Sequence, residues 1–141
     1  MKYKSTKLFA TIVFLMVSVC TFAQQGPDNE KEQQKQMDEM IEKQLERYTD
    51  LLDLEDWQIF YLDSIYHHDY TALRDELAQM SKARVGNVDL YQQVQDKWFE
   101  KMYCSIRKVL GDEQWAKYLK TGAEKEKKAR DKRAAKLNKQ N

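Results

Sequence analysis

The chain has 141 residues, a formal net charge of +1 and 33% charged residues. A chain of this length is enough for one domain and not for two. The sequence contains no glycine-rich phosphate loop, no serine elbow and no CxxC pair, which excludes the enzyme classes that those motifs define. We therefore expect a protein that is not an enzyme and carries no cofactor.

The first 23 residues have the pattern of a secretory signal peptide. Lysines at positions 2, 4 and 7 precede an apolar run, Leu8–Val19, and small residues follow where a signal peptidase cuts. The run is shorter than a membrane span. We expect cleavage after Ala23 and a periplasmic or secreted protein of 118 residues with a net charge of −2, since the segment carries three lysines and no acid. A retained membrane anchor is a less favoured alternative, because the apolar run is short. A lipoprotein at Cys20 is also less favoured, because Val19 is large for a residue before a lipidated cysteine.

Charge is distributed unevenly over the rest of the chain. Residues 28–63 carry twelve acids and four bases, whereas residues 117–141 carry ten bases and three acids. The two segments should attract each other or an oppositely charged partner. An anionic membrane surface or an acidic protein suits the basic segment, and we expect no nucleic-acid partner for an exported protein.

Cysteine use leaves two alternatives open. If Cys20 leaves with the signal peptide, Cys104 is the one cysteine that remains. Such a cysteine in an exported protein is either buried or able to form a disulfide between subunits. Burial is the favoured interpretation, because free cysteine packs as a small apolar side chain.

Hydrophobic periodicity predicts an all-α protein. A flexible polar lead-in is expected over residues 24–36, and apolar residues then recur every three or four positions. The pattern predicts an elongated antiparallel hairpin or bundle of about four helices, over residues 28–52, 53–83, 89–110 and 112–135. The first turns of the first helix are expected to be weakly held, and the helical domain is expected to span residues 37–121.

The expected helix boundaries rest on capping residues. Asp53 is the predicted N-cap of the second helix, with Asp56 as an approximate capping-box partner. Gly86 and Asn87 tolerate left-handed backbone angles and mark the turn before the third helix. Beyond Gly122 the chain has strong helix propensity but almost no apolar residue, so residues 122–141 are predicted to be a solvated, fraying basic helix or a disordered tail.

Two segments repeat one pattern. Leucine is followed four residues later by glutamine in Leu54-x-x-x-Gln58 and again in Leu110-x-x-x-Gln114, each at a predicted helix start. The leucine can staple the incoming chain to the helix, and the glutamine can reach back to a free backbone N–H.

This arrangement resembles the Spy/CpxP family of periplasmic proteins, whose mark is a repeated Leu-Thr-x-x-Gln motif; here Glu55 and Gly111 stand at the threonine positions. The resemblance covers residues 37–119 and implies a small, long-armed, cradle-shaped dimer. That family includes an ATP-independent chaperone, an inhibitory partner of an envelope-stress sensor, and metal-binding relatives. The chain also resembles small secreted helical proteins of Bacteroidota without an assigned function.

The resemblance implies binding of unfolded clients or of a partner protein. Exposed aromatic and methionine side chains suit that task, because they adapt to many sequences. Helix-period aromatics are more often core residues, yet a thin helical body cannot hide all of them. The candidate client-binding residues are Trp57, Phe60, Tyr61, Tyr66, Trp98, Phe99 and Met102.

Two further functions remain as alternatives. The basic tail can dock a structural or interaction module onto a membrane or an acidic partner. A metal-responsive protein is the other, with Asp63 and His67 as its weak candidate ligands at i and i+4. His68 points about 100° away from His67 on a helix, and two ligands do not complete a zinc site, so a second helix or a dimer mate is needed. Surface histidines without a metal are the favoured interpretation.

Overall fold

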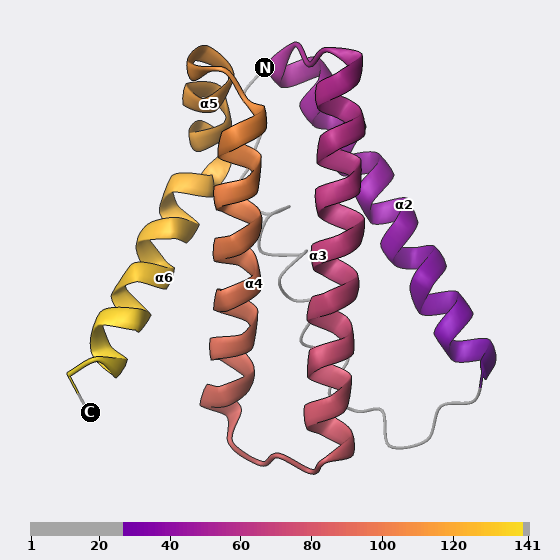
Figure 1. The fold of residues 1–141 in the computed structure, drawn as a ribbon, viewed down its shortest axis with the longest axis vertical. Helices are drawn as coiled ribbons and strands as arrows, with labels where there is room; N and C mark the ends of the chain where they lie inside the picture. Colours follow the sequence, from indigo (N-terminus) through magenta and orange to yellow (C-terminus); the bar gives the residue numbers. More distant parts are fainter. Residues whose placement is uncertain (1–26, 140–141) are drawn as a thin grey trace, which may run out of the picture.

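The computed structural model of the chain describes residues 27–139, and these residues form helices joined by short turns (Figure 1). The elements are α2 (Pro27–Leu52), α3 (Asp56–Lys82), α4 (Val88–Val109), α5 (Asp112–Tyr118), the π-helical turn η2 (Leu119–Ala123) and α6 (Glu124–Leu137). No strand occurs within the described part of the chain, which confirms the all-α prediction. The expected signal peptide and Cys20 lie outside the described residues.

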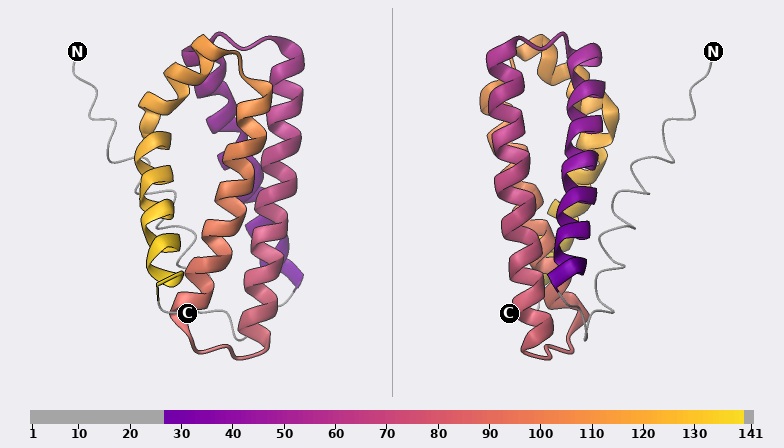
Figure 2. Two further views of the ribbon diagram at one scale, coloured as in Figure 1. Left: turned by 60° about the vertical axis from the view of Figure 1, so that its left-hand side comes forward. Right: turned by 90° about the vertical axis from the view of Figure 1, so that its right-hand side faces the viewer.

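The helices form two layers. α3 and α4 make an antiparallel hairpin, and α2 and α6 both lie on the same side of it (Figure 2). α2 packs against α3, and α6 packs against α4. The other side of the hairpin is left uncovered by any described helix, so side chains on that side face outward.

The core lies between the two layers. In α2 its members recur every three or four residues, as the sequence pattern predicts. The buried apolar side chains are Met37, Ile41, Leu45, Tyr48, Leu52, Leu54, Leu62, Tyr66, Tyr70, Leu73, Leu77, Met102, Ile106, Leu110, Tyr118 and Ala123. Trp57 and Tyr61, which also fit the predicted stripe of the second helix, are exposed instead.

Two predicted caps differ from the structure. Asp53 has a positive φ of 54° and belongs to the turn after α2; the N-cap of α3 is Glu55. In the turn before α4, Arg84 rather than Gly86 or Asn87 takes the left-handed conformation. Asn87 instead caps α4, because its side-chain oxygen accepts from the Asp89 amide at 2.9 Å.

The N-terminal end of α2 lies within one residue of the predicted helix start. The helix begins at Pro27, a residue favoured in the first turn because its missing N–H has no partner there in any case. Residues 28–36 are helical, as the predicted helix over residues 28–52 implies, and the flexibility of the lead-in stays a prediction. No helix within residues 27–139 is long and apolar enough to cross a membrane.

The predicted fourth helix is interrupted. Gly122 has a φ of 113°, and this kink separates α5 and η2 from α6. α6 then runs back along α4, where it is held by ion pairs. Arg133 binds Asp96 through two nitrogens at 2.6 and 2.7 Å, and Arg130 Nε lies 3.2 Å from Glu100. Of the two forms predicted for the tail, the structure therefore shows a helix over residues 124–137. This helix packs on α4 rather than fraying in solvent.

Candidate functional site

The two repeated motifs meet in space. The side-chain amides of Gln58 and Gln114 face each other and exchange two hydrogen bonds, from Gln58 Nε2 to Gln114 Oε1 at 2.7 Å and from Gln114 Nε2 to Gln58 Oε1 at 2.9 Å. The residues are 56 positions apart in sequence. Their pairing joins the start of α3 to the start of α5.

Each glutamine makes the same remaining contacts. Gln58 Oε1 accepts from the Glu55 amide and Gln114 Oε1 from the Gly111 amide, both at 3.0 Å. The second N–H of each side chain crosses to the other motif: Gln58 donates to the Val109 carbonyl at 2.9 Å, and Gln114 to the Asp53 carbonyl at 3.1 Å. Every donor and acceptor position of both amides is therefore in use.

We call this pair the glutamine clasp, formed by Gln58 and Gln114. Its surroundings are apolar, since Leu54 and Leu110, the leucines of the two motifs, are buried in the core. Gln58 is only 3% exposed, so its hydrogen bonds are shielded from water. The clasp has no group that could act as a nucleophile, acid or base. It is a structural device that holds one end of the bundle together.

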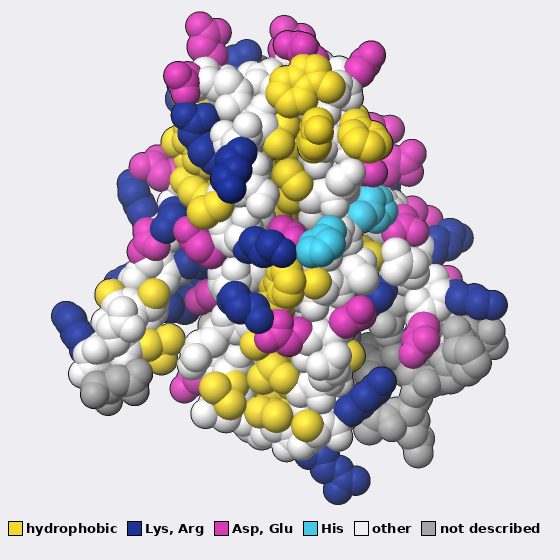
Figure 3. All heavy atoms as spheres, in the orientation of Figure 1, with side chains coloured by type: hydrophobic (Ala, Val, Ile, Leu, Met, Phe, Trp, Pro, Cys, Tyr) yellow, Lys and Arg dark blue, Asp and Glu magenta, His cyan; other side chains and the backbone are white. Residues whose placement is uncertain are grey.

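The outer aromatic patch consists of Trp57, Phe60 and Tyr61 on the uncovered side of α3. Their exposed fractions are 49%, 68% and 53%. Tyr61 lies edge-on to both other rings, with centroid distances of 6.1 Å to Trp57 and 5.9 Å to Phe60. Figure 3 looks onto this side of the molecule, where hydrophobic side chains gather over the upper part of α3. Water-exposed aromatic side chains in contact with one another make this patch a candidate interaction surface.

The other four candidate client-binding residues lie elsewhere. Tyr66 and Met102 are in the core, because they point toward α2 and α6, and they are not surface residues of the described chain. Phe99 packs against the same core. Trp98 is partly buried on the outer side of α4, with Lys97 and Lys101 5.2 and 4.4 Å from its ring. These burial data correct the assignment of Tyr66 and Met102 to a client surface.

The candidate metal ligands belong to a cluster of one histidine and two carboxylates. His67 Nε2 lies 3.3 Å from Asp63, and His67 Nδ1 lies 3.6 Å from Asp38 on α2. Because the two carboxylates lie on different ring nitrogens, they cannot share one ion with the imidazole. Among residues 27–139 no group of three metal-binding side chains is suitably placed. His68 faces away from this cluster and contacts the buried Asp69 at 2.7 Å.

Cys104 is exposed, contrary to the favoured expectation of burial. It lies on α4, where its thiol is 3.7 Å from the carboxylate of Glu100. Position 104 lies two residues from both Met102 and Ile106, which are buried, and the rotation of roughly 200° around the helix turns Cys104 outward.

Comparison of the chain with protein-family models, with curated proteins and with solved structures finds no match. The resemblance to the Spy/CpxP family therefore stays an interpretation of the repeated motif.

Proposed function

We propose that this protein is an ATP-independent chaperone or an envelope-stress adaptor of the periplasm, which binds unfolded or partner proteins on a helical surface. The observation that supports this function best is the outer aromatic patch, three exposed rings in which Tyr61 contacts both Trp57 and Phe60, on a side of the hairpin that no described helix covers. The proposal includes export by the signal peptide and assembly as a homodimer, in line with the Spy/CpxP resemblance.

The patch has a suitable strength for transient binding. A buried aromatic residue removes about 150–250 Å² from water, and since these three are about half exposed, a client could cover about 300 Å² of them. At about 25 cal/mol per Å² this corresponds to about 8 kcal/mol before losses. Association itself costs about 4–15 kcal/mol, so the patch alone supports weak, reversible capture. A protein that holds and then releases unfolded chains needs such binding.

The test is suppression of aggregation of a reduced model client. We expect the wild-type chain to suppress aggregation at equimolar ratio, and a variant with Trp57→Ser, Phe60→Ser and Tyr61→Ser to lose most of this effect while keeping its helicity. Val88→Ser with Leu90→Ser is the matched control, because these apolar residues are also exposed but lie at the start of α4. Equal suppression by the triple variant and by the wild type would refute the assignment.

A second candidate is docking through the basic C-terminal helix. Arg130 and Arg133 of α6 are engaged by α4, but Lys125, Lys132 and Lys136 are exposed on α6. An exposed cationic helix face attracts anionic lipid, with about 1 kcal/mol for each base near the surface. Changing these three lysines to glutamate should abolish sedimentation with anionic vesicles under this hypothesis. Retention of binding would leave α6 with a structural role only.

A further inference from the structure

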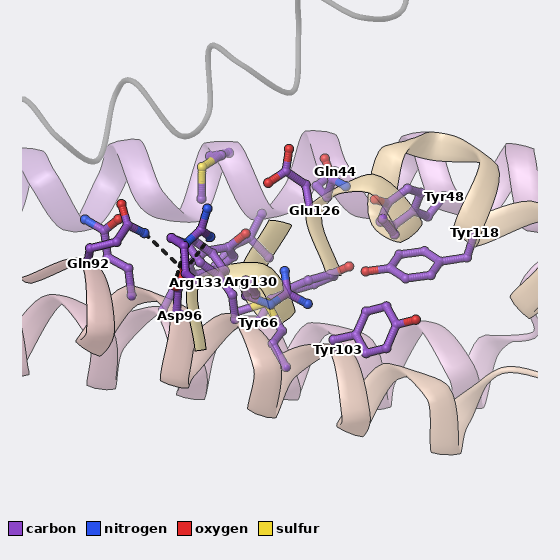
Figure 4. A pocket seen from close by; sticks show the side chains of 17 residues that line it. Gln44, Tyr48, Tyr66, Gln92, Asp96, Tyr103, Tyr118, Glu126, Arg130 and Arg133 are labelled. Carbon is purple, nitrogen blue, oxygen red and sulfur yellow. Dashed lines mark hydrogen bonds and ion pairs between the residues drawn. The ribbon is translucent and has the colours of Figure 1, made fainter. Parts of the chain in front are cut away.

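A cavity of about 110 Å³ lies between α2, α4 and α6, on the inner side of the hairpin (Figure 4). Five tyrosines take part in its wall, together with apolar residues such as Met40 and Phe99. The tyrosines are Tyr48, Tyr66, Tyr70, Tyr103 and Tyr118. The outer aromatic patch is on the opposite side of the hairpin, so this is a separate feature of the molecule.

Arg130 contributes a charged group to the same wall. It is 8% exposed, and its guanidinium lies over the Tyr103 ring at 5.5 Å. Its Nε donates to Glu100, but no described residue accepts a hydrogen bond from its buried Nη2. Buried guanidinium N–H groups are rarely left without an acceptor, because the desolvation penalty is large. The neighbouring Arg133 differs, since Asp96 binds it through both carboxylate oxygens.

The wall offers hydrogen-bond donors besides Arg130. Burial raises the pKa of Tyr66 and of Tyr118 well above the usual 10.0, so both hydroxyls stay protonated at neutral pH and can donate. Figure 4 shows the Tyr118 hydroxyl pointing toward the middle of the cavity. Among the carboxylates nearby, Asp96 is neutralised by Arg133 and Glu100 is shared by Arg130 and Lys127. Glu126 on α6 is the remaining acid of the wall.

We propose that this cavity binds a small organic monocarboxylate, with its apolar body among the tyrosines and its carboxylate on the Arg130 guanidinium. An engineered, enclosed cavity of about 150 Å³ takes up benzene. The present space is smaller but partly open to solvent, so it admits an apolar body of about four carbon atoms, or a six-carbon ring that stays partly exposed. A charge-assisted hydrogen bond from a guanidinium to a carboxylate is among the stronger contacts available in a protein. Aromatic acids and short branched aliphatic acids have the required size and charge.

The test uses sodium benzoate as the probe and benzyl alcohol as its uncharged counterpart. Calorimetric titration of the full chain, with NMR detection of the tyrosine ring signals, should show saturable benzoate binding that shifts the signals of Tyr66 and Tyr118. Benzyl alcohol should bind at least about tenfold more weakly, a difference of about 1.4 kcal/mol. No shift with benzoate up to about 10 mM, the response expected if water alone fills the cavity, would overturn the proposal.

Three variants assign the contacts. Arg130→Met should weaken benzoate binding at least about tenfold. Arg133→Met combined with Asp96→Asn, which removes an already paired guanidinium together with its carboxylate, should change it less than about threefold. Glu126→Gln should strengthen binding, because it removes a negative charge from the wall. If Arg130→Met does not fold by circular dichroism, Glu126→Gln and the benzyl alcohol comparison still decide the question. Equal losses for the two arginine variants, or equal affinity for acid and alcohol, would refute the carboxylate site.

Discussion

The glutamine clasp makes a quantitative prediction about stability. Gln58 and Gln114 together make six hydrogen bonds, four to the backbone and two to each other. A typical hydrogen bond contributes about 1 kcal/mol net, and leaving a buried partner unsatisfied costs about 1–3 kcal/mol. Because Gln58 is buried and takes part in four of the six bonds, Gln58→Ala should lower the free energy of unfolding by about 3 kcal/mol.

The double variant separates the clasp from two independent caps. Gln114 also takes part in four bonds but is less buried, so Gln114→Ala should lower the free energy of unfolding by about 2 kcal/mol. The two Gln–Gln bonds are lost in either single variant, and the double variant should therefore fall short of the sum by about 2 kcal/mol.

Urea unfolding followed by far-ultraviolet circular dichroism measures these differences for the four chains of the cycle. Gln93→Ala is the matched control, since this glutamine is exposed in the interior of α4, and it should change stability by less than about 0.5 kcal/mol. Additive losses, with a coupling energy below about 0.5 kcal/mol, would show that the two amides act only as separate helix caps and would refute the clasp.

Two further predictions concern the kink and the buried tyrosines. Gly122→Ala should destabilise the chain by about 1–3 kcal/mol, because an L-residue is strained at a φ of 113°. Gly86→Ala is the control and should be neutral, because a Cβ at this position meets nothing within 4 Å. Equal effects of the two substitutions in urea unfolding would contradict this explanation of the kink. Burial raises the pKa of Tyr66 and of Tyr118 in the folded chain, so the unfolded chain loses these protons first as pH rises. The urea concentration at the unfolding midpoint should therefore decrease as the pH rises above about 10. Tyr66→Phe should make this decrease smaller, whereas Tyr61→Phe, at an exposed position, should not. An identical pH dependence in both variants would count against buried tyrosines as its cause.

Local features were predictable from the sequence, and the clasp shows where such prediction ends. The reach of each glutamine to its own helix start spans three residues, so spacing alone predicts it. The pairing of Gln58 with Gln114 depends on how α4 returns to the start of α3. One signal was present in the sequence: two identical caps near the core each leave a side-chain N–H₂ group that needs acceptors.

The exposure of the aromatic residues was less predictable. Trp57, Tyr61, Leu62 and Tyr66 all fit one broad helical stripe, but two layers cover only one side of α3. Which part of a wide stripe faces outward depends on where α2 packs, and periodicity does not contain that information. The same holds for α6, which has no apolar stripe and packs on α4 through long-range pairs such as Arg133 with Asp96.

Direct contact between the outer aromatic patch and an unfolded chain is the most informative measurement. A photo-crosslinking amino acid at position 60 should capture a permanently unfolded, carboxymethylated model protein and should capture much less of the same protein in its native form. The same crosslinker at position 88, where Val88 at the start of α4 is at least as exposed as Phe60, should give little product with either. Equal capture from both positions, or equal capture of the folded and unfolded forms, would contradict a client-binding role for Trp57, Phe60 and Tyr61.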